Sequence, residues 1–292
     1  MTLIERAASL LTEFDDPTSS APQKTEFAAA AKRPANSLGL NQGPSRSVVL
    51  DLRRLAQFGI VVPSSQWSRT VEEFRIIKRR LLVAALESDS EEHNPFKRAV
   101  MVTSARPEEG KTFVSLNLAL AFASESDTKV VLIDGDTQRQ TLLARCGIDA
   151  QKGLVDILGG EADIADVLLQ TDVPNLSVLP SGSFGPHVPD LLSSNRVRDL
   201  VTEITRRYSD CFIVLDSPPC LASSQTSGLA ACVGQIVLVV EANRTQREEV
   251  EAAIRLIDQC AQISLLLNKT EFVPNAGFGA YYHYYQCTPN GI

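Results

Sequence analysis

The stretch that decides the fold is Ala99-Val100-Met101-Val102-Thr103-Ser104-Ala105-Arg106-Pro107-Glu108-Glu109-Gly110-Lys111-Thr112-Phe113. Residues 99–104 are largely apolar and predict a buried strand, and residues 113–123 predict a helix. Between them, residues 105–112 match the phosphate-loop pattern G-x-x-x-x-G-K-[ST], with Ala105 in the first glycine position. Because strand, loop and helix follow in this order, the stretch predicts a nucleotide-binding site.

The chemistry of a phosphate loop explains this layout. Backbone N–H groups of residues 105–112 would point at phosphate oxygens, and the dipole of the following helix favours negative charge. Gly110 permits close approach of the backbone, and Lys111 neutralises phosphate charge. The hydroxyl of Thr112 can ligate Mg²⁺. We therefore expect residues 105–112 to bind ATP with Mg²⁺.

Downstream of residue 99, apolar strands alternate with helical patterns, as βαβ units require. Several strands are nearly continuous apolar runs, which is typical of strands buried on both faces of a parallel sheet. We expect a doubly wound, mostly parallel α/β sheet of the P-loop NTPase type. The predicted strands are 99–104, 129–134, 175–179, 211–216, 234–240 and 262–268, and the predicted helices are 111–124, 138–146, 196–208, 223–232 and 245–260.

Three carboxylates follow two of these strands. Asp134 ends the run 129–134 and Asp136 lies two residues beyond it, and Asp216 ends the run 211–216. In open α/β sheets, ligands bind beyond the carboxyl ends of the strands, so all three acids could converge on the phosphate loop. The alternative is that each is a helix cap or a turn residue. Beside a phosphate loop, we expect them to bind Mg²⁺ or to take part in catalysis.

The amino-acid composition limits which partners and which cellular compartment we expect for the protein. The 292 residues carry a formal charge of −7, which argues against nucleic acid as the main partner. The six cysteines fall in no metal-binding spacing, which favours reduced thiols. No apolar run reaches the ~18 residues of a membrane span, and residues 1–9 lack the features of a signal peptide. We expect a cytoplasmic protein.

The chain divides into four predicted parts. Residues 1–46 combine an amphipathic helical pattern at 3–14 with a linker rich in Pro, Ser and Ala. Residues 47–96 form an N-terminal arm with a helical pattern at 69–87, and residues 97–270 form the nucleotide-binding domain. The last part, residues 271–292, is a flexible tail.

Four of the five tyrosines lie within this tail, at Tyr281, Tyr282, Tyr284 and Tyr285. Their flanks, rich in Gly, Asn and Pro, show neither strand alternation nor a helical stripe. The spacing therefore predicts an accessible cluster. The alternative is an aromatic cap packed on the domain, or a peptide docked on a partner.

These motifs together resemble the bacterial tyrosine autokinases of exopolysaccharide synthesis, more narrowly their exosortase-associated (PEP-CTERM) branch. The three nucleotide motifs of that family look like residues 105–112, 131–136 and 213–216, and its tail resembles the tyrosine cluster. Its helix before the core carries a spacing similar to Glu72-x-x-Arg75-x-x-Lys78. Two departures are Lys78, where the family usually has Arg, and the run 137–140 after the second motif.

The resemblance implies a protein-tyrosine kinase that phosphorylates its own tail in trans. Lys111, Asp134, Asp136 and Asp216 would be catalytic, and Thr112, Asp136 and Asp216 would hold Mg²⁺. The tyrosine proton would pass to Asp134 or Asp136, and the resemblance favours Asp134. The phosphorylated residues would be Tyr281, Tyr282, Tyr284 and Tyr285, and the oligomer interface would use Glu72, Arg75 and Lys78.

The implied partners are other copies of the chain, the cytoplasmic tail of a membrane polysaccharide copolymerase, and a tyrosine phosphatase. Such a partner would bring the chain to the inner membrane. One alternative is a membrane-positioning or partition ATPase of the same fold. Those proteins usually carry lysine where this chain has Arg106. A further alternative is a non-catalytic regulator of the copolymerase.

Overall fold

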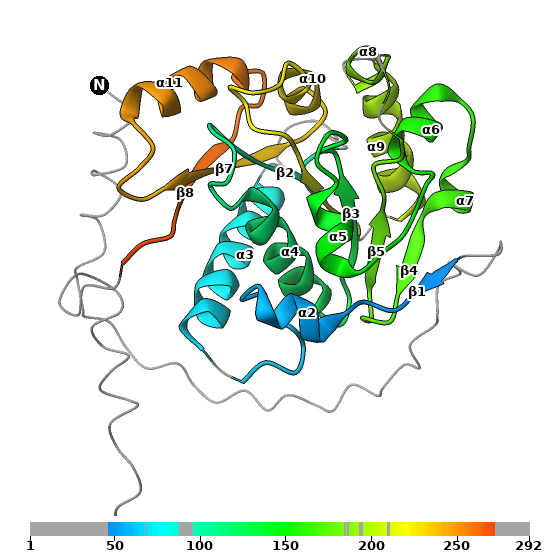
Figure 1. Ribbon diagram of the computed structural model, residues 1–292, viewed down its shortest axis with the longest axis horizontal. Coiled ribbons are helices and arrows are strands. Elements are labelled where there is room, and N and C mark those ends of the chain that lie inside the picture. Colours follow the sequence, from blue (N-terminus) through cyan, green and yellow to red (C-terminus); the bar gives the residue numbers. More distant parts are fainter. Residues whose placement is uncertain are drawn as a thin grey trace, which may run out of the picture. The chain divides into compact units, whose positions relative to one another are not determined.

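A sheet of eight strands forms the centre of the computed structural model (Figure 1). The structure describes residues 46–271 apart from 67, 88–95, 184, 186, 193–194 and 209–210. The helical pattern predicted at 3–14, the linker up to residue 45 and tail residues 272–292 lie outside the described residues. The tyrosine cluster is therefore not described.

The sheet is almost entirely parallel. Its strands are β1 Ser47–Val48, β2 Ala99–Ser104, β3 Lys129–Asp134, β4 Leu169–Thr171, β5 Leu176–Leu179, β6 Cys211–Asp216, β7 Gln235–Glu241 and β8 Ile263–Asn268. They lie in the order β1-β4-β5-β3-β6-β2-β7-β8. Only the β4–β5 pair is antiparallel among the described pairs. The doubly wound parallel sheet predicted from the sequence is confirmed.

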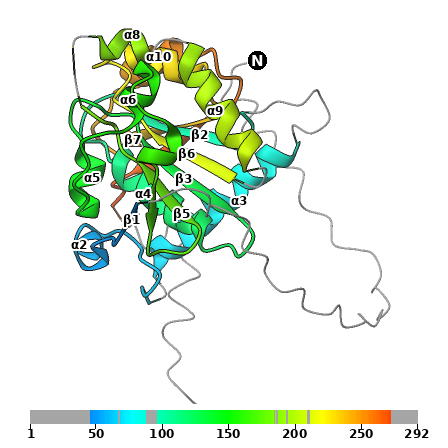
Figure 2. The same ribbon diagram turned by 90° about the vertical axis from the view of Figure 1, so that its right-hand side faces the viewer.

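Helices cover both faces of the sheet (Figure 2). They are α2 Leu52–Gln57, α3 Arg69–Glu87, α4 Lys111–Ala123, α5 Thr141–Cys146, α6 Leu154–Gly159, α7 Ile164–Val167, α8 Val188–Leu192, α9 Asn195–Arg207, α10 Gln225–Ala230 and α11 Arg247–Leu256. The predicted bounds of α3 are confirmed at both ends. The helices predicted at 223–232 and 245–260 are shorter in the structure. The short elements β1, β4, α2, α6, α7 and α8 were not predicted from the sequence.

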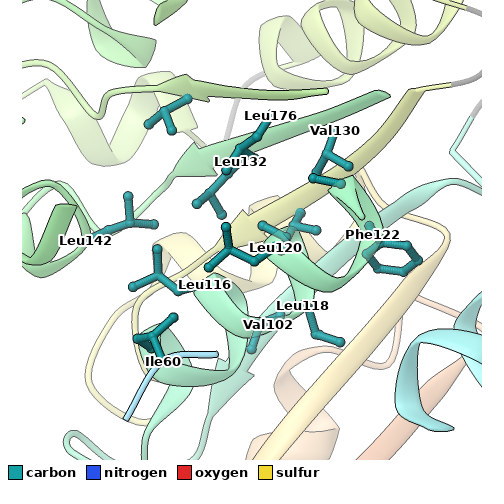
Figure 3. Packing of buried hydrophobic residues seen from close by; sticks show 14 of the residues in the cluster. Ile60, Val102, Leu116, Leu118, Leu120, Phe122, Val130, Leu132, Leu142 and Leu176 are labelled. Carbon is teal, nitrogen blue, oxygen red and sulfur yellow. The ribbon is translucent and has the colours of Figure 1, made fainter. Parts of the chain in front are cut away.

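Alternate residues of the central strands supply two separate hydrophobic cores. One core joins Val102, Val130 and Leu132 to helices α2 to α5, and it is seen from close by in Figure 3. The other joins residues such as Met101 and Ile133 to helices α6 to α11. Because both faces are covered, the central strands read as continuous apolar runs. Each large side chain buried in this way contributes about 1.5–3 kcal/mol.

Described residues of the segment 47–96, which was predicted as an arm preceding the domain, pack into that domain. Strand β1 pairs with β4 at one edge of the sheet. The backbone N–H of Val61 donates to Asn117 Oδ1 at 2.8 Å, which ties the segment to α4. Phe74 and Leu81 of α3 are buried in the same core as α4. Described residues of this segment thus belong to the nucleotide-binding domain.

The cysteines of the described chain are free and buried. Cys146, Cys211, Cys220, Cys232 and Cys260 form no disulfide in the described chain. Burial raises the pKa of the Cys146 and Cys211 thiols to about 12. Such thiols are structural and unreactive. Within the described ranges, no helix combines the length and the apolar composition that a bilayer crossing requires.

The stacked pair Phe122–Phe212 tests this packing. The ring centroids lie 4.4 Å apart, and both side chains are buried. We expect Phe122→Ala to lower the free energy of unfolding by about 3–5 kcal/mol, because it leaves a cavity between α4 and β6. The matched control is Phe58→Ala, since Phe58 is 45% exposed beneath Arg145. Urea unfolding should show a loss of about 1 kcal/mol or less for the control. Equal losses would contradict this description of the core.

Candidate nucleotide and metal site

The phosphate loop leaves the sheet at the end of β2 and enters α4 at Lys111. Gly110 is the N-cap of α4 and has φ +101°, a conformation that favours glycine. A Cβ atom at this position would collide with the side-chain amide of Asn268. The backbone conformation therefore favours glycine at 110, and a larger residue would also displace the Asn268 amide.

The other loop residues divide into buried and exposed positions. Ala105 is fully buried, so the methyl group that replaces the first glycine packs inside the domain. Pro107 and Glu108 are exposed. The buried carboxylate of Glu109 turns back into the loop, where its Oε2 accepts a hydrogen bond from the backbone N–H of Arg106 at 2.6 Å. Glu109 thus braces the loop from within.

Lys111, the loop's cation, is held by a carboxylate. Its Nζ lies 2.9 Å from Asp136 Oδ2, and both side chains are buried. Such a pair is costly to desolvate and costly to break, because a lone buried charge would remain. The structure thereby brings together two residues that the sequence analysis assigned to the site from separate motifs.

The strand register places the other two carboxylates side by side. Asp134 pairs in register with Asp216 across the β3–β6 ladder, and both are buried. Asp216 Oδ1 accepts a hydrogen bond from Ser115 Oγ of α4 at 2.9 Å. Asp134 Oδ1 accepts one from the backbone N–H of Asp136 at 3.2 Å. All three predicted acids therefore lie at the carboxyl ends of neighbouring strands.

Burial controls the protonation of these acids. Desolvation raises the pKa of Asp134 well above its usual range, and the charges of Asp216 and Asp136 raise it further. Desolvation also raises the pKa of Asp216, whereas the positive charge of Lys111 and the hydrogen bond from Ser115 oppose the rise. The site therefore concentrates more negative charge than its single lysine offsets.

Polar atoms without partners mark where ligands would bind. Among the described residues, every buried side-chain nitrogen or oxygen without a hydrogen-bond partner lies in the last residue of β3 or β6 or in the segment that follows it. These atoms are Asp134 Oδ2, Thr137 Oγ1, Asp216 Oδ2 and both amide atoms of Gln225. A native fold leaves few such atoms, and each calls for a ligand or a water molecule. The arrangement fits a nucleotide with a cation.

The donor set suits Mg²⁺ bound together with phosphate. No group of three or more His, Cys, Asp or Glu side chains in the described part of the chain is arranged to hold a metal by itself. Mg²⁺ typically uses one or two carboxylates together with substrate phosphates and water. Thr112, Asp136 and Asp216 provide such a partial set.

Several residues of the site lie outside the sequence motifs that predicted it. Ser115 is one turn beyond Lys111, and Thr137 and Gln225 lie beyond the acids. Their place in the sequence is the only feature that could have pointed to the site, since each is a polar residue close to a predicted strand end or loop. Asn268 ends β8 and donates to the carbonyl of Glu109 at 2.8 Å. Nothing in the sequence connects residues 109 and 268.

The helix proposed for the oligomer interface presents two of its three residues to solvent. Exposed Arg75 and half-buried Glu72 form an ion pair with an N–O distance of 3.5 Å. Lys78 differs, because it is only 8% exposed and its ammonium pairs with Glu125, just beyond α4. Lys78 is thus engaged within its own chain, and Glu72 and Arg75 remain accessible. The four tail tyrosines lie outside the described residues.

Neutralising single carboxylates tests the charge balance of the site. The pKa of Asp134 is higher in the folded chain than in the unfolded chain, so stability falls as pH rises through the folded value. Asp134→Asn should therefore increase the free energy of unfolding at pH 7 in metal-free buffer. This gain should shrink as the pH falls toward 3.8, the ordinary value.

Asp136→Asn is the matched contrast. It leaves Lys111 buried without its carboxylate, so it should lower the free energy of unfolding by roughly 1–3 kcal/mol at pH 7. Urea titrations of both variants across pH would check the two signs. Destabilisation by Asp134→Asn at pH 7 would contradict the description of Asp134 as a desolvated charge.

Comparison with known proteins places the domain in a family. Residues 98–270 match the AAA domain family. Tyrosine-protein kinase CpsD of Streptococcus agalactiae is 31% identical over 207 residues, covering 70% of this chain and 85% of CpsD. Tyrosine-protein kinase ptk of Acinetobacter johnsonii is 31% identical over 160 residues, covering 55% of this chain. That match spans only 21% of the Acinetobacter protein.

Solved structures of similar proteins point to the same family. The VpsO kinase domain is 33% identical, with a TM-score of 0.55 over 66% of this chain and 98% of that domain. The septum site-determining protein MinD from Pyrococcus horikoshii has a TM-score of 0.50 at 22% identity, covering 60% of this chain and 72% of MinD. At that identity the likeness to MinD shows a shared fold alone. The chain belongs to the P-loop AAA domain family and, within it, to the bacterial tyrosine-protein kinases.

Proposed function

We propose that this chain is an ATP-dependent protein-tyrosine kinase that phosphorylates its own cluster Tyr281, Tyr282, Tyr284 and Tyr285. The observation that carries the proposal is the convergence of the phosphate-loop lysine with three buried carboxylates at one edge of the sheet. The tyrosine-protein kinases among its relatives support it. The proposal includes a role in exopolysaccharide synthesis or export and membership of the exosortase-associated branch.

The loop would hold the nucleotide through its backbone. Residues 105–112 would supply N–H groups to the phosphates of ATP, and Lys111 would exchange its contact with Asp136 for phosphate oxygens. Thr112, Asp136 and Asp216 would hold Mg²⁺, which when bound neutralises charge on the phosphates. Ser115 keeps Asp216 oriented through its hydrogen bond.

Asp134 is the better placed of the two carboxylates considered as proton acceptor. A tyrosine hydroxyl has a pKa near ~10 and needs a base or a nearby cation to become nucleophilic. In the nucleotide complex proposed above, Asp136 would ligate Mg²⁺, whereas Asp134 Oδ2 has no hydrogen-bond partner within the described chain. We therefore assign the tyrosine proton to Asp134.

The tail has the reach to serve a neighbouring copy. Thirteen positions separate Asn268, the end of β8, from Tyr281. An extended segment of that length spans at most roughly 43–47 Å. We propose that phosphorylation occurs in trans within a homo-oligomer, with Glu72 and Arg75 of α3 at the interface.

The further partners belong to the same proposal. We propose that the chain acts in the cytoplasm, where it meets the tail of a membrane polysaccharide copolymerase, and that a tyrosine phosphatase reverses its modification. The acidic composition, with a pI near 5.1, disfavours nucleic acid as a partner.

One contact favours a kinase over a membrane-positioning or partition ATPase. Arg106 occupies the loop position where those ATPases usually carry a lysine that crosses to a partner. Here its guanidinium lies 3.5 Å from Glu249 of α11 in the same chain. A non-catalytic regulator is disfavoured, because its site would not need three buried acids around Lys111.

A mixing experiment tests catalysis and the trans mechanism together. One variant, Lys111→Met, keeps the tail and should lose at least about 100-fold in rate. The other changes all four tail tyrosines to Phe and keeps the site. Neither should gain phosphotyrosine alone with Mg-ATP, but the Lys111→Met chain should be labelled when both are mixed. The measurement is phosphotyrosine detection on chains distinguished by a size tag.

Tyr208→Phe is the matched control, because Tyr208 is the one tyrosine outside the cluster. It lies 5.8 Å from Lys129 Nζ, at the end of α9, and its loss should leave labelling unchanged. Labelling of the wild type without labelling in the mixture would point to phosphorylation in cis. ATP hydrolysis without any phosphotyrosine would favour the positioning ATPase.

Phosphorylation should also weaken the oligomer. Each phosphotyrosine carries about −1.5 to −2 charges, so modified tails gathered in one assembly repel each other. We expect light scattering to report a smaller mass after stoichiometric phosphorylation, and also for the Glu72→Ala/Arg75→Ala double variant. The control pair Arg247→Ala/Glu251→Ala removes a similar exposed ion pair from α11 and should leave the mass unchanged. An unchanged mass after full phosphorylation would remove this part of the proposal.

A further inference from the structure

The last residues before the tail hold the outer part of the phosphate loop. Asn268 Nδ2 donates to the backbone carbonyl of Glu109 at 2.8 Å. The next residue, Lys269, donates from Nζ to the carbonyl of Glu108, also at 2.8 Å. Two consecutive residues at the end of β8 thus bind two consecutive carbonyls of the loop. We call these two contacts the tail-root clasp.

The connection between β7 and α11 supports the clasp. Lys269 Nζ also lies 3.2 Å from Glu241 Oε2, at the end of β7. The carbonyl of Asn268 accepts a hydrogen bond from the backbone N–H of Ala242 at 2.9 Å. The hydroxyl of Thr245 donates to the carboxylate of Glu109 from the same connection. Side chains at the end of β8 and in the β7–α11 connection therefore hold the outer part of the loop.

Backbone strain is concentrated at the same place. Five non-glycine residues of the described chain have positive φ, and three of them lie here: Glu108 at +70°, Asn243 at +59° and Lys269 at +56°. Such conformations are energetically unfavourable for non-glycine residues and persist only when the surroundings hold them. The Lys269–Glu108 hydrogen bond joins two of these strained residues. Release of one of them would remove a restraint on the other.

We propose that Asn268 and Lys269 are positioning residues, which hold the phosphate loop in its nucleotide-binding shape and couple that shape to the root of the tyrosine tail. The inference rests on the proposed function, because it takes the loop to bind ATP and the tail to be its substrate. Coupling between sites is reciprocal, so a clasp that favours nucleotide binding is itself stabilised by the nucleotide. Nucleotide binding would thereby fix the point from which the tail departs.

Nucleotide affinity is the first readout. In the full chain, Lys269→Met should weaken binding of a fluorescent ADP analogue about 5-fold. Asn268→Asp keeps the shape of the side chain but removes the donor, and it should do the same. Lys269→Arg retains a cationic donor and should stay within about 2-fold of the wild type. Arg247→Met, which removes an exposed cation paired with Glu251 on α11, is the matched control and should bind like the wild type.

Tail release is the second readout. Glutamyl endopeptidase cleaves after Glu271, two residues beyond Lys269, and mass spectrometry detects the released peptide 272–292. A non-hydrolysable ATP analogue should slow this cleavage in the wild type and in Arg247→Met. At saturating concentration, the analogue should slow cleavage of Lys269→Met less than cleavage of the wild type, or not at all.

These readouts do not depend on phosphotyrosine formation. A wild type that binds nucleotide while Lys269→Met and Asn268→Asp bind equally well would overturn the clasp and leave the proposed kinase standing. Cleavage after Glu271 that is unaffected by nucleotide in the wild type would overturn the coupling to the tail. A wild type that binds no nucleotide would refute the proposed function and this inference with it.

Discussion

The buried Lys111–Asp136 ion pair is the interaction on which the rest of the site depends. Lys111 opens α4, and Asp136 follows β3, so the pair joins the phosphate loop to the neighbouring carboxylates. One ammonium cannot balance three buried acids. Asp134 and Asp216 each keep one oxygen without a partner in the described chain, and the pKa of Asp134 rises through burial and through the charges of its neighbours. The site is therefore built to accept further positive charge and phosphate donors.

The central architecture was predictable because it follows from local patterns. Strands covered by helices on both faces read as apolar runs, so β2, β3 and β6 could be placed from the sequence to the residue. The parallel arrangement then brings their carboxyl ends to one edge, where Asp134 lies in register with Asp216. The phosphate loop was recognisable because its chemistry restricts residue types at adjacent positions.

Other features depended on partners far apart in the sequence. Lys78 resembled one of three solvent-facing charges on α3, but it is buried against Glu125 from the turn before β3. Strands β1 and β4 are two and three residues long, too short for any periodic signal. Glu109 occupies a variable position of the phosphate-loop pattern, which gives no sign that its carboxylate accepts hydrogen bonds from the Arg106 N–H and the Thr245 hydroxyl. Gln225 follows Asp216 in the sequence, and no pattern around it predicts that its side chain is buried.

The central claim is that this site transfers phosphate to the chain's own tail. Intact-mass spectrometry of the wild-type chain after incubation with Mg-ATP tests it most directly, with fragmentation to locate the added groups. The account predicts added phosphoryl groups confined to Tyr281, Tyr282, Tyr284 and Tyr285. Consumption of ATP with no phosphoryl group on the chain, or with phosphoryl groups only outside these four residues, would contradict it.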